Sequence, residues 1–255
     1  MRKMSARCIG GWLAVLSVGA LSTVTEAAVI FADDFESYAD TTALNAVWTR
    51  GAGTDTDTYL SVGPAGSTNT SDTVRHDNRI GRRDRNFAPA LPTADAPVVV
   101  EFDFYDDNAE VGIGDNAYNQ LLAFSGTTLT QLVAMGKSNL TATDDPTKYQ
   151  ARVAFNSSNW LTLNATRSVG WHTFRAEIFS NEVDFYVDGV ADVQNVAITG
   201  STFGDGFSQA RIGTGLSSRA EVSYYDNYSV SVVPEPASLA ALSVAGLALM
   251  RRRRT

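Results

Sequence analysis

The stretch Trp171–Val190, WHTFRAEIFSNEVDFYVDGV, decides the fold. Its apolar residues occupy every second position in two runs on either side of Ser180-Asn181, first Phe174, Ala176 and Ile178, then Val183, Phe185 and Val187. A period of two is typical of a β-strand with one buried face, and Asp188-Gly189 supplies a further tight turn. The stretch therefore predicts an antiparallel hairpin.

Shorter alternating runs fill most of the chain between Ala28 and Val232. They are separated by Gly, Asn, Asp and Ser turns and cover residues 29–35, 97–106, 119–126, 128–135, 148–156, 208–215 and 220–233. No long stretch keeps a helical period, and no repeat of fixed length is present. Residues 51–86 are rich in Gly, Ser, Thr and Asp, and we expect them to be looped apart from Tyr59–Val62. The pattern predicts one all-β domain, a sandwich or barrel.

The N-terminus has the three parts of a signal peptide. Basic residues near the start precede an apolar run from Ile9 to Leu21 and then small residues up to Ala27. We expect a signal helix over residues 1–27 with cleavage after Ala27. The only cysteine, Cys8, lies before the apolar run, so an exported body has no thiol and must rely on core burial for stability.

The C-terminus ends in VVPEPASLAALSVAGLALMRRRRT. The apolar run 237–250 would span about 21 Å as a helix, against roughly 30 Å of membrane hydrocarbon. The arginines after it, Arg251, Arg252, Arg253 and Arg254, favour the cytoplasmic side, which places the body outside. Pro234 and Pro236 end the domain and leave Glu235 on an extended, accessible segment.

Pro234-Glu235-Pro236, the short apolar helix and the arginine cluster together resemble the PEP-CTERM sorting signal of Gram-negative bacteria that make extracellular polysaccharide. The resemblance covers residues 233–255. It implies recognition by an exosortase-type membrane protease, with a short transmembrane helix as a transient anchor in the inner membrane. Cleavage near the triplet would then deliver the body to the envelope, the outer surface or the extracellular matrix.

The charge of the body limits its partners. The whole chain carries −8, but the segment from Ala28 to Val233 has 13 lysines and arginines against 26 aspartates and glutamates, a net charge of −13. Nucleic acid and anionic lipid are therefore poor partners for the body as a whole. Neutral glycans and cations remain compatible with it.

Three stretches resemble the concanavalin A-like jelly roll of laminin-G-like domains: residues 31–38 (FADDFESY), 170–189 (GWHTFRAEIFSNEVDFYVDG) and 221–230 (EVSYYDNYSV). The resemblance implies a single jelly-roll sandwich over residues 28–232. Because the chain lacks a complete catalytic set, we expect a non-catalytic module that binds an extracellular polysaccharide or another matrix component, with no required cofactor. Fold alone does not determine activity.

A hydrolase is the alternative function. Residues 101–106, EFDFYD, resemble the Glu-x-Asp-x-x-Glu strand of laminarinase-type glycoside hydrolases, which implies Glu101, Asp103 and Asp106 as a catalytic set. Retaining hydrolysis needs two carboxyl groups about 5 Å apart. Strand alternation places Asp106 on the face opposite Glu101 unless a bulge turns it, and Asp106 is one methylene shorter than the family's glutamate. Both functions stay open on the sequence.

A structural calcium ion is a further hypothesis. Asp34 and Glu36 on the first strand would approach Asp226 on the last strand if the two ends of the domain pair. We expect Asp226 to share a face with Tyr224, Tyr228 and Val230, and a carboxylate in an apolar register must be paired or bound to a cation. A backbone N–H or an arginine would serve Asp226 equally well.

The remaining candidates are aromatic and basic. Tyr105, Tyr118 and Trp160 would stack on sugar rings if exposed, although single aromatic residues are commonly core or rim residues. The basic segment 75–85 would contact acidic polysaccharide or form an internally paired loop. His76 and His172 lack the spacing of a zinc site or a Ser-His-Asp triad, and we expect His172 to pack in the sandwich.

Overall fold

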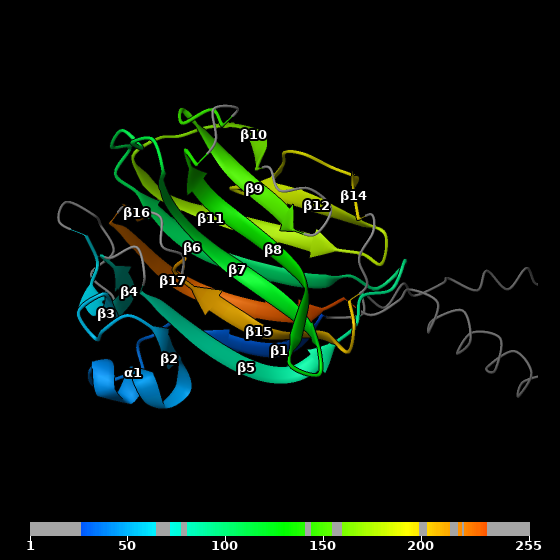
Figure 1. The fold of residues 1–255 in the computed structure, drawn as a ribbon, viewed down its shortest axis with the longest axis horizontal. Coiled ribbons are helices and arrows are strands. Elements are labelled where there is room, and N and C mark those ends of the chain that lie inside the picture. Colours follow the sequence, from blue (N-terminus) through cyan, green and yellow to red (C-terminus); the bar gives the residue numbers. More distant parts are fainter. Residues whose placement is uncertain are drawn as a thin grey trace, which may run out of the picture. The chain divides into compact units, whose positions relative to one another are not determined.

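A computed structural model describes residues 27–64, 72–77, 81–140, 144–154, 160–198, 203–214, 219–220 and 222–233 (Figure 1). Within these ranges, no helix combines the length and the apolar character that a membrane crossing requires. The predicted signal peptide up to residue 26 and the predicted sorting signal from Pro234 onward lie outside the described residues.

The described chain forms two sheets that lie face to face (Figure 1). Sheet A has the strand order β13 (Val190–Ala191), β12 (Glu182–Val187), β11 (Gly170–Ile178), β6 (Val98–Asp106), β17 (Ser223–Val232), β4 (Asp72–His76) and β3 (Thr58–Val62), with β1 (Ala28–Asp33) beside β17 and β14 (Val196–Ala197) beside β12. Sheet B has the order β10 (Leu161–Thr166), β9 (Lys148–Ala154), β8 (Thr128–Ser138), β7 (Asp115–Ser125), β15 (Gly206–Ile212), β5 (Arg82–Ala90) and β2 (Thr49–Ala52), with the short β16 (Arg219–Ala220) parallel to β7.

The predicted hairpin is confirmed as β11 and β12. Phe174 pairs with Val187, Ala176 with Phe185 and Ile178 with Val183, and all six side chains belong to the buried core. The other edge of β11 pairs with β6 in an unbroken register from Gly170 opposite Asp106 to Ile178 opposite Val98. Alternation along β6 consequently places Phe102 and Phe104 in the core between the two sheets.

The closing strand β17 corrects one prediction. A bulge between Asp226 and Ser229 interrupts its register with β6, and Asn227 takes a positive φ of 48°. The bulge puts Tyr225, Tyr228 and Val230 all in the core. The prediction that Tyr228 and Val230 share a face with Asp226 was therefore wrong, because strict alternation does not survive an inserted residue.

In the FADDFESY segment, the carboxylate of Asp33 connects the first strand to the residues packed around it. Asp33 accepts hydrogen bonds from Tyr38 Oη (2.6 Å) and Trp48 Nε1 (2.8 Å), and it forms an ion pair with Arg85. The guanidinium of Arg85 lies 4.2 Å from the ring centre of Phe31. These contacts hold β1, the short helix α1 (Thr41–Val47) and β5 together.

The prediction that residues 51–86 are looped was wrong for β4 and for the parts of β2 and β5 that fall in this segment, whereas β3 coincides with the excepted patch Tyr59–Val62. Its arginines alternate between two environments. Arg83 is fully buried and bonds Asp55 at 3.0 Å, and Arg85 reaches Asp33, whereas Arg82 lies on the outer side. The inward arginines are tolerated because each pairs with a carboxylate that lies far away in the sequence. The composition of the segment does not reveal these pairs.

His76 predicts how stability depends on pH. It is fully buried, its Nδ1 lies 2.8 Å from Thr58 Oγ1, and burial lowers its pKa to about 4 from an ordinary value of 6.5. In the unfolded chain the imidazole of His76 is protonated below about pH 6.5. In the folded chain it is protonated only below about pH 4. We expect His76 to lower the free energy of unfolding by roughly 3 kcal/mol across that window.

Urea denaturation from pH 3.5 to 7.5 measures this loss. H76Q lowers stability at neutral pH but should flatten the slope between pH 6.5 and 4, because glutamine does not titrate. An H76Q protein that keeps the full slope of the wild type would assign the acid sensitivity to other groups.

Candidate functional site

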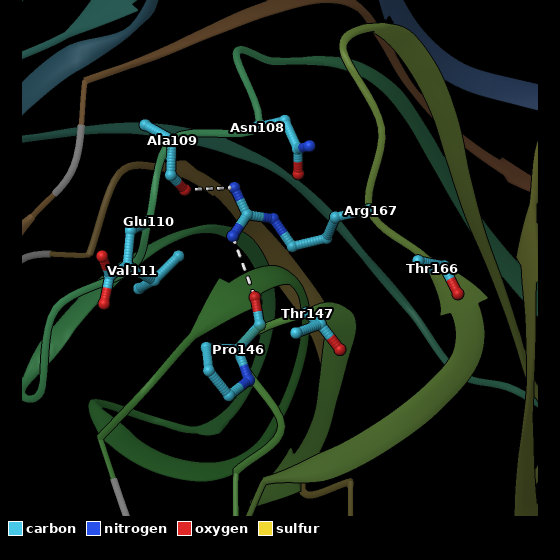
Figure 2. Close-up of a pocket in the computed structure, with 8 residues that line it drawn as sticks. All are labelled: Asn108, Ala109, Glu110, Val111, Pro146, Thr147, Thr166 and Arg167. Atoms are coloured by element: carbon cyan, nitrogen blue, oxygen red, sulfur yellow. Dashed lines mark hydrogen bonds between the residues drawn. The ribbon is translucent and has the colours of Figure 1, made fainter.

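A pocket of about 480 Å³ opens among the connections β6–β7, β8–β9 and β10–β11 at one end of the sandwich (Figure 2). Its lining consists of Asn108, Ala109, Glu110, Val111, Pro146, Thr147, Thr166 and Arg167. The pocket thus depends on three chain segments that are far apart in sequence. Any ligand there would contact connections between strands, supported by the core beneath them.

Arg167 joins the three segments through one guanidinium group. Its Nε and Nη2 donate to the two carboxylate oxygens of Asp106, each at 2.8 Å. Its Nη1 donates to the carbonyl of Pro146 and its Nη2 to the carbonyl of Ala109, both at 2.9 Å (Figure 2). Asp106 and Arg167 are both buried, so water does not weaken these bonds.

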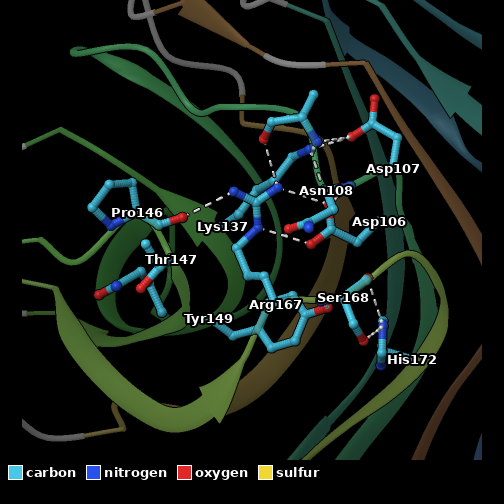
Figure 3. Close-up of polar contacts among 12 residues, drawn as sticks. Asp106, Asp107, Asn108, Lys137, Pro146, Thr147, Tyr149, Arg167, Ser168 and His172 are labelled. Carbon is cyan, nitrogen blue, oxygen red and sulfur yellow. Dashed lines mark hydrogen bonds and ion pairs between the residues drawn. The ribbon is translucent and has the colours of Figure 1, made fainter.

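A second cation completes the buried group (Figure 3). Lys137 is almost fully buried, with Nζ 3.4 Å from Asp106 Oδ1 and 3.2 Å from Asp107 Oδ1. Burial alone would raise the pKa of Asp106, but the hydrogen bonds of Arg167 and the charge of Lys137 outweigh it and hold that pKa below its usual range. Burial and Asp106 raise the pKa of the nearby Tyr149. Asp106 is therefore an ionised structural anchor.

The structure does not bring the predicted catalytic set together. Asp106 points into the interior, whereas Glu101 lies on the outer side of β6, 3.5 Å from Arg175 Nη1. The register between β6 and β11 has no bulge that would turn Asp106 toward Glu101. Asp103 accepts hydrogen bonds from Thr173 Oγ1 at 2.6 Å and from Asn227 Nδ2 at 2.8 Å.

The rim of the pocket carries polar groups that the fold does not use. The side chains of Asn108, Glu110 and Thr166 are exposed and make no hydrogen bond within the described part of the chain. They supply an amide, a carboxylate and a hydroxyl, which together donate and accept hydrogen bonds. Apolar surface between them comes from Ala109, Val111 and Pro146. Such a mixture is suited to an uncharged polar ligand.

A chain of hydrogen bonds holds the β10–β11 turn that bears Arg167. His172 Nδ1 lies 2.8 Å from Asp188 Oδ2, and His172 Nε2 lies 3.2 Å from Ser168 Oγ (Figure 3). The order of atoms is that of a serine-hydrolase triad. However, Nε2 lies closer, at 3.0 Å, to the carbonyl oxygen of Ser168, and a nitrogen that donates to this oxygen does not accept the serine proton. The contacts fasten the turn, and His172 packs against Tyr149 as predicted.

The three predicted sugar-stacking residues lie on two different surfaces. Tyr118 and Trp160 meet edge to face at 4.7 Å between ring centres, against sheet B, and both are buried. Tyr105 lies on the outer side of sheet A, between Trp171 and Tyr224. None of the three lines the pocket of Figure 2.

The acidic residues predicted to bind calcium accept hydrogen bonds from backbone N–H groups. Asp34 accepts from the backbone N–H of Glu36, Glu36 from that of Asp72, and Asp226 from that of Asn227. Within the described residues, no three acidic, histidine or cysteine side chains are gathered as a metal site would require. Calcium held by fewer side chains and backbone oxygens stays a prediction. A smaller pocket of about 250 Å³ lies beside Asp34 and Asn227.

Sequence reasoning missed the residues that build the main pocket. Arg167 and Lys137 are isolated basic residues in β-rich stretches, and Asp106 was predicted as a catalytic carboxylate and not as part of a buried ion pair. The one usable signal was that alternation turns Asp106 inward, because a buried carboxylate demands a cationic partner. The sequence does not show which cation that is.

Comparisons with known proteins establish the fold. No family model matches the chain, and no curated protein matches its sequence. Among solved structures, a carbohydrate esterase of the Shiga toxin-encoding bacteriophage phi24B superposes with a TM-score of 0.55 at 11% identity, over 82% of this chain and 100% of that one. An endo-1,3-β-glucanase from Streptomyces sioyaensis gives 0.50 at 15% identity, over 84% and 99%. The chain has a jelly-roll sandwich fold of the concanavalin A-like type, and these identities carry the comparison no further than the fold.

The buried pair predicts a strongly asymmetric mutational response. R167M leaves Asp106 charged and unpaired in the interior, and we expect it to lower the free energy of unfolding by about 3 to 5 kcal/mol. Adding D106N to R167M should restore a substantial part of the loss, because the uncompensated charge is removed.

Urea denaturation at pH 7 measures both changes. R175M is the matched control, since Arg175 and Glu101 form a half-exposed pair on the outer side of sheet A, for which we expect less than about 1 kcal/mol. Equal losses for R167M and R175M would contradict the role given to the buried pair.

Proposed function

We propose that this protein is exported and displayed at the cell surface or in the extracellular matrix, where its sandwich acts as a non-catalytic glycan-binding module. The observation that carries the binding role is the pocket of Figure 2, a concave site with a rigid buried frame and an unused polar rim. Its volume lies within the range of about 300 to 1,000 Å³ of small-molecule sites.

The chemistry of the rim matches a sugar. Hydroxyl groups need both donors and acceptors, which the Asn108 amide, the Glu110 carboxylate and the Thr166 hydroxyl supply. The C–H face of a sugar ring can pack on Val111 and Pro146. Because Arg167 holds the surrounding segments in place, little ordering free energy would be lost on binding. The two similar structures are a carbohydrate esterase and an endo-1,3-β-glucanase, which agrees with a carbohydrate ligand.

Binding is favoured over hydrolysis by the placement of the carboxylates. Glycoside hydrolysis requires two carboxyl groups on opposite sides of one scissile bond. Among the described residues that line the pocket, Glu110 is the only acidic one, and the nearby Asp106 is held in its ion pair with Arg167. Glu101 lies on the outer face of β6, five residues along the strand from Asp106, which lies on the inner face.

The pocket predicts a defined set of weakened variants. We expect N108G, E110A and T166V each to reduce affinity for a neutral oligosaccharide about tenfold, because each removes one group that hydrogen-bonds a sugar hydroxyl. Glycine is chosen at position 108 because Asn108 has a positive φ of 55°. A glycan array followed by calorimetry identifies the ligand and measures its affinity.

T128V is the control, since Thr128 is an exposed threonine at the start of β8 and does not line the pocket. Unchanged affinity in all three pocket variants would show that the pocket of Figure 2 does not bind the oligosaccharide. Sugar release that disappears in E101Q would instead establish the hydrolase alternative.

The sorting role rests on the two ends of the chain. We infer cleavage after Ala27, insertion of the 237–250 helix with Arg251–Arg254 on the cytoplasmic side, and release by an exosortase-type protease near Glu235.

In the host, mass spectrometry of the mature protein should find a chain that begins at Ala28 and ends near Pro236. Replacing Pro234, Glu235 and Pro236 by alanine should leave the arginine tail attached and the protein in the inner membrane. If the wild-type protein keeps residues 237–255, the segment is a simple membrane anchor and the proposed cleavage is contradicted.

A further inference from the structure

The outer surface of sheet A carries a row of aromatic side chains that the proposed pocket does not use. The row crosses five neighbouring strands, β11, β6, β17, β4 and β3 (Figure 1). Trp171 lies opposite Tyr105, Tyr105 opposite Tyr224, Tyr224 opposite Arg75, and Arg75 opposite Tyr59. Each side chain is the direct cross-strand partner of the next, so the five form one line across the sheet. We call these five residues the aromatic row.

The aromatic row faces away from the core. Its sequence neighbours Phe104, Tyr225 and Val74 belong to the core between the sheets, so alternation along each strand directs the row outward. None of its four rings belongs to either hydrophobic cluster of the described residues, and all five side chains are partly exposed. The row is therefore apolar surface that the packing of the two sheets does not use.

Three rings of the row pack against one another. The ring of Tyr105 meets those of Trp171 and Tyr224 edge to face, at 5.6 Å and 6.2 Å between ring centres. The hydroxyl groups of Tyr105 and Tyr224 make no hydrogen bond within the described part of the chain. The rings thus offer apolar surface together with unused donors and acceptors, which complement the C–H faces and the hydroxyl groups of a sugar.

The other end of the row is fixed by an arginine between two rings. The guanidinium carbon of Arg75 lies 5.4 Å from the ring centre of Tyr224 and 5.9 Å from that of Tyr59. Asp77 holds this arrangement, because it accepts hydrogen bonds from Arg75 Nε at 2.6 Å and from Tyr59 Oη at 2.8 Å. Little ordering free energy would be lost when a ligand binds to side chains that are already held in place.

The charges beside the row are paired within the fold. Arg75 pairs with Asp77, and Arg175, further along β11, pairs with Glu177 at 2.6 Å and with Glu101 at 3.5 Å. The two arginines thus meet three carboxylates, which leaves these pairs without a cationic excess. The net charge of −13 on the body repels an anionic polymer as well. The surface is therefore suited to an uncharged ligand.

The shape of the row favours an extended ligand. Four strand-to-strand steps separate β11 from β3, which places the two ends of the row roughly 19 Å apart. The row is one side chain wide, because the next outward positions hold polar residues, Thr173 on β11 and Asp103 on β6. A standard protein–protein interface covers about 800 Å² on each partner, which a strip of this width does not offer. A linear chain of neutral sugars matches both its length and its width.

We propose that the aromatic row binds a neutral polysaccharide, whose chain lies across the strands of sheet A with sugar rings against Trp171, Tyr105 and Tyr224. The proposal rests on the glycan-binding function proposed above and adds a second surface and a polymeric ligand to it. The C–H faces of the sugars pack on the aromatic rings, and the hydroxyl groups of Tyr105 and Tyr224 bond to sugar hydroxyls.

The test measures binding of the purified protein to three neutral polysaccharides, hydroxyethylcellulose, laminarin and galactomannan, by affinity gel electrophoresis. Polygalacturonate is the charged comparison. We expect at least one neutral polymer to retard the protein, with an affinity that sodium chloride leaves unchanged, and polygalacturonate not to retard it. Y105A and Y224A should each weaken binding about tenfold, because each removes one ring, whereas Y105F should weaken it less.

Y186A is the matched control. Tyr186 is a partly exposed tyrosine on the outer side of β12, in the same sheet but outside the row, so its loss should leave binding unchanged. Thermal melting of each variant verifies that the fold is kept. Ring pairs that serve stability alone would lower the melting temperature of Y105A and Y224A and leave their affinity unchanged.

Trp171 supplies a second readout. The other two tryptophans of the described chain, Trp48 and Trp160, are buried, so N-bromosuccinimide should oxidise Trp171 ahead of them. A bound polysaccharide should slow the oxidation of Trp171 severalfold, as measured by mass spectrometry of its peptide.

The pocket and the aromatic row fail independently. E110A should weaken neutral oligosaccharide binding and leave polysaccharide binding intact, and Y105A should do the reverse. Absence of binding to all three neutral polymers would overturn the proposal, as would unchanged affinity in both Y105A and Y224A or an equal loss in Y186A. A dimer that Y105A dissociates would assign the row to self-association and also overturn it. Loss of polysaccharide binding in E110A alone would move the polymer to the pocket and leave only the pocket's role standing.

Discussion

The end of the sandwich that bears the pocket depends on the buried bond between Arg167 and Asp106. Each charge loses several kcal/mol of hydration on leaving water, and only a complete set of partners offsets that loss. The set is complete here, because both oxygens of Asp106 are engaged and Arg167 also donates to two carbonyl groups. A partly formed version would leave a buried charge unpaired, so Arg167 ties the conformations of the three connections around the pocket to one another.

The hairpin and most strands were predictable because one face of each strand is apolar and the other polar. The same alternation placed Asp106 on the inner side of β6, and the structure keeps that register. The partner was not predictable, since Arg167 lies 61 residues away and nothing near it in sequence marks it as buried. Local patterns report burial, whereas pairing of buried charges is decided by topology.

The segment 51–86 shows where pattern reading fails. In β5, Arg83 and Arg85 face inward while Arg82 and Asp84 face outward, so both sides of the strand are polar and the period of two carries no hydrophobic signal. The inward arginines are neutralised by Asp55, 28 residues earlier, and by Asp33, 52 residues earlier. A similar limit applies to Tyr118 and Trp160, which the fold brings together, whereas Tyr105 lies on the other sheet.

The net charge of the body bears on the ligand proposed for the pocket. The segment from Ala28 to Val233 carries −13 and repels polyanions over most of its surface, which favours an uncharged glycan. The cations beside the pocket are neutralised within the fold, because Arg167 pairs with Asp106 and Lys137 with Asp106 and Asp107. All the hydrogen bonds of Arg167 go to groups of the fold, so recognition of a ligand would depend on the exposed polar side chains of the rim.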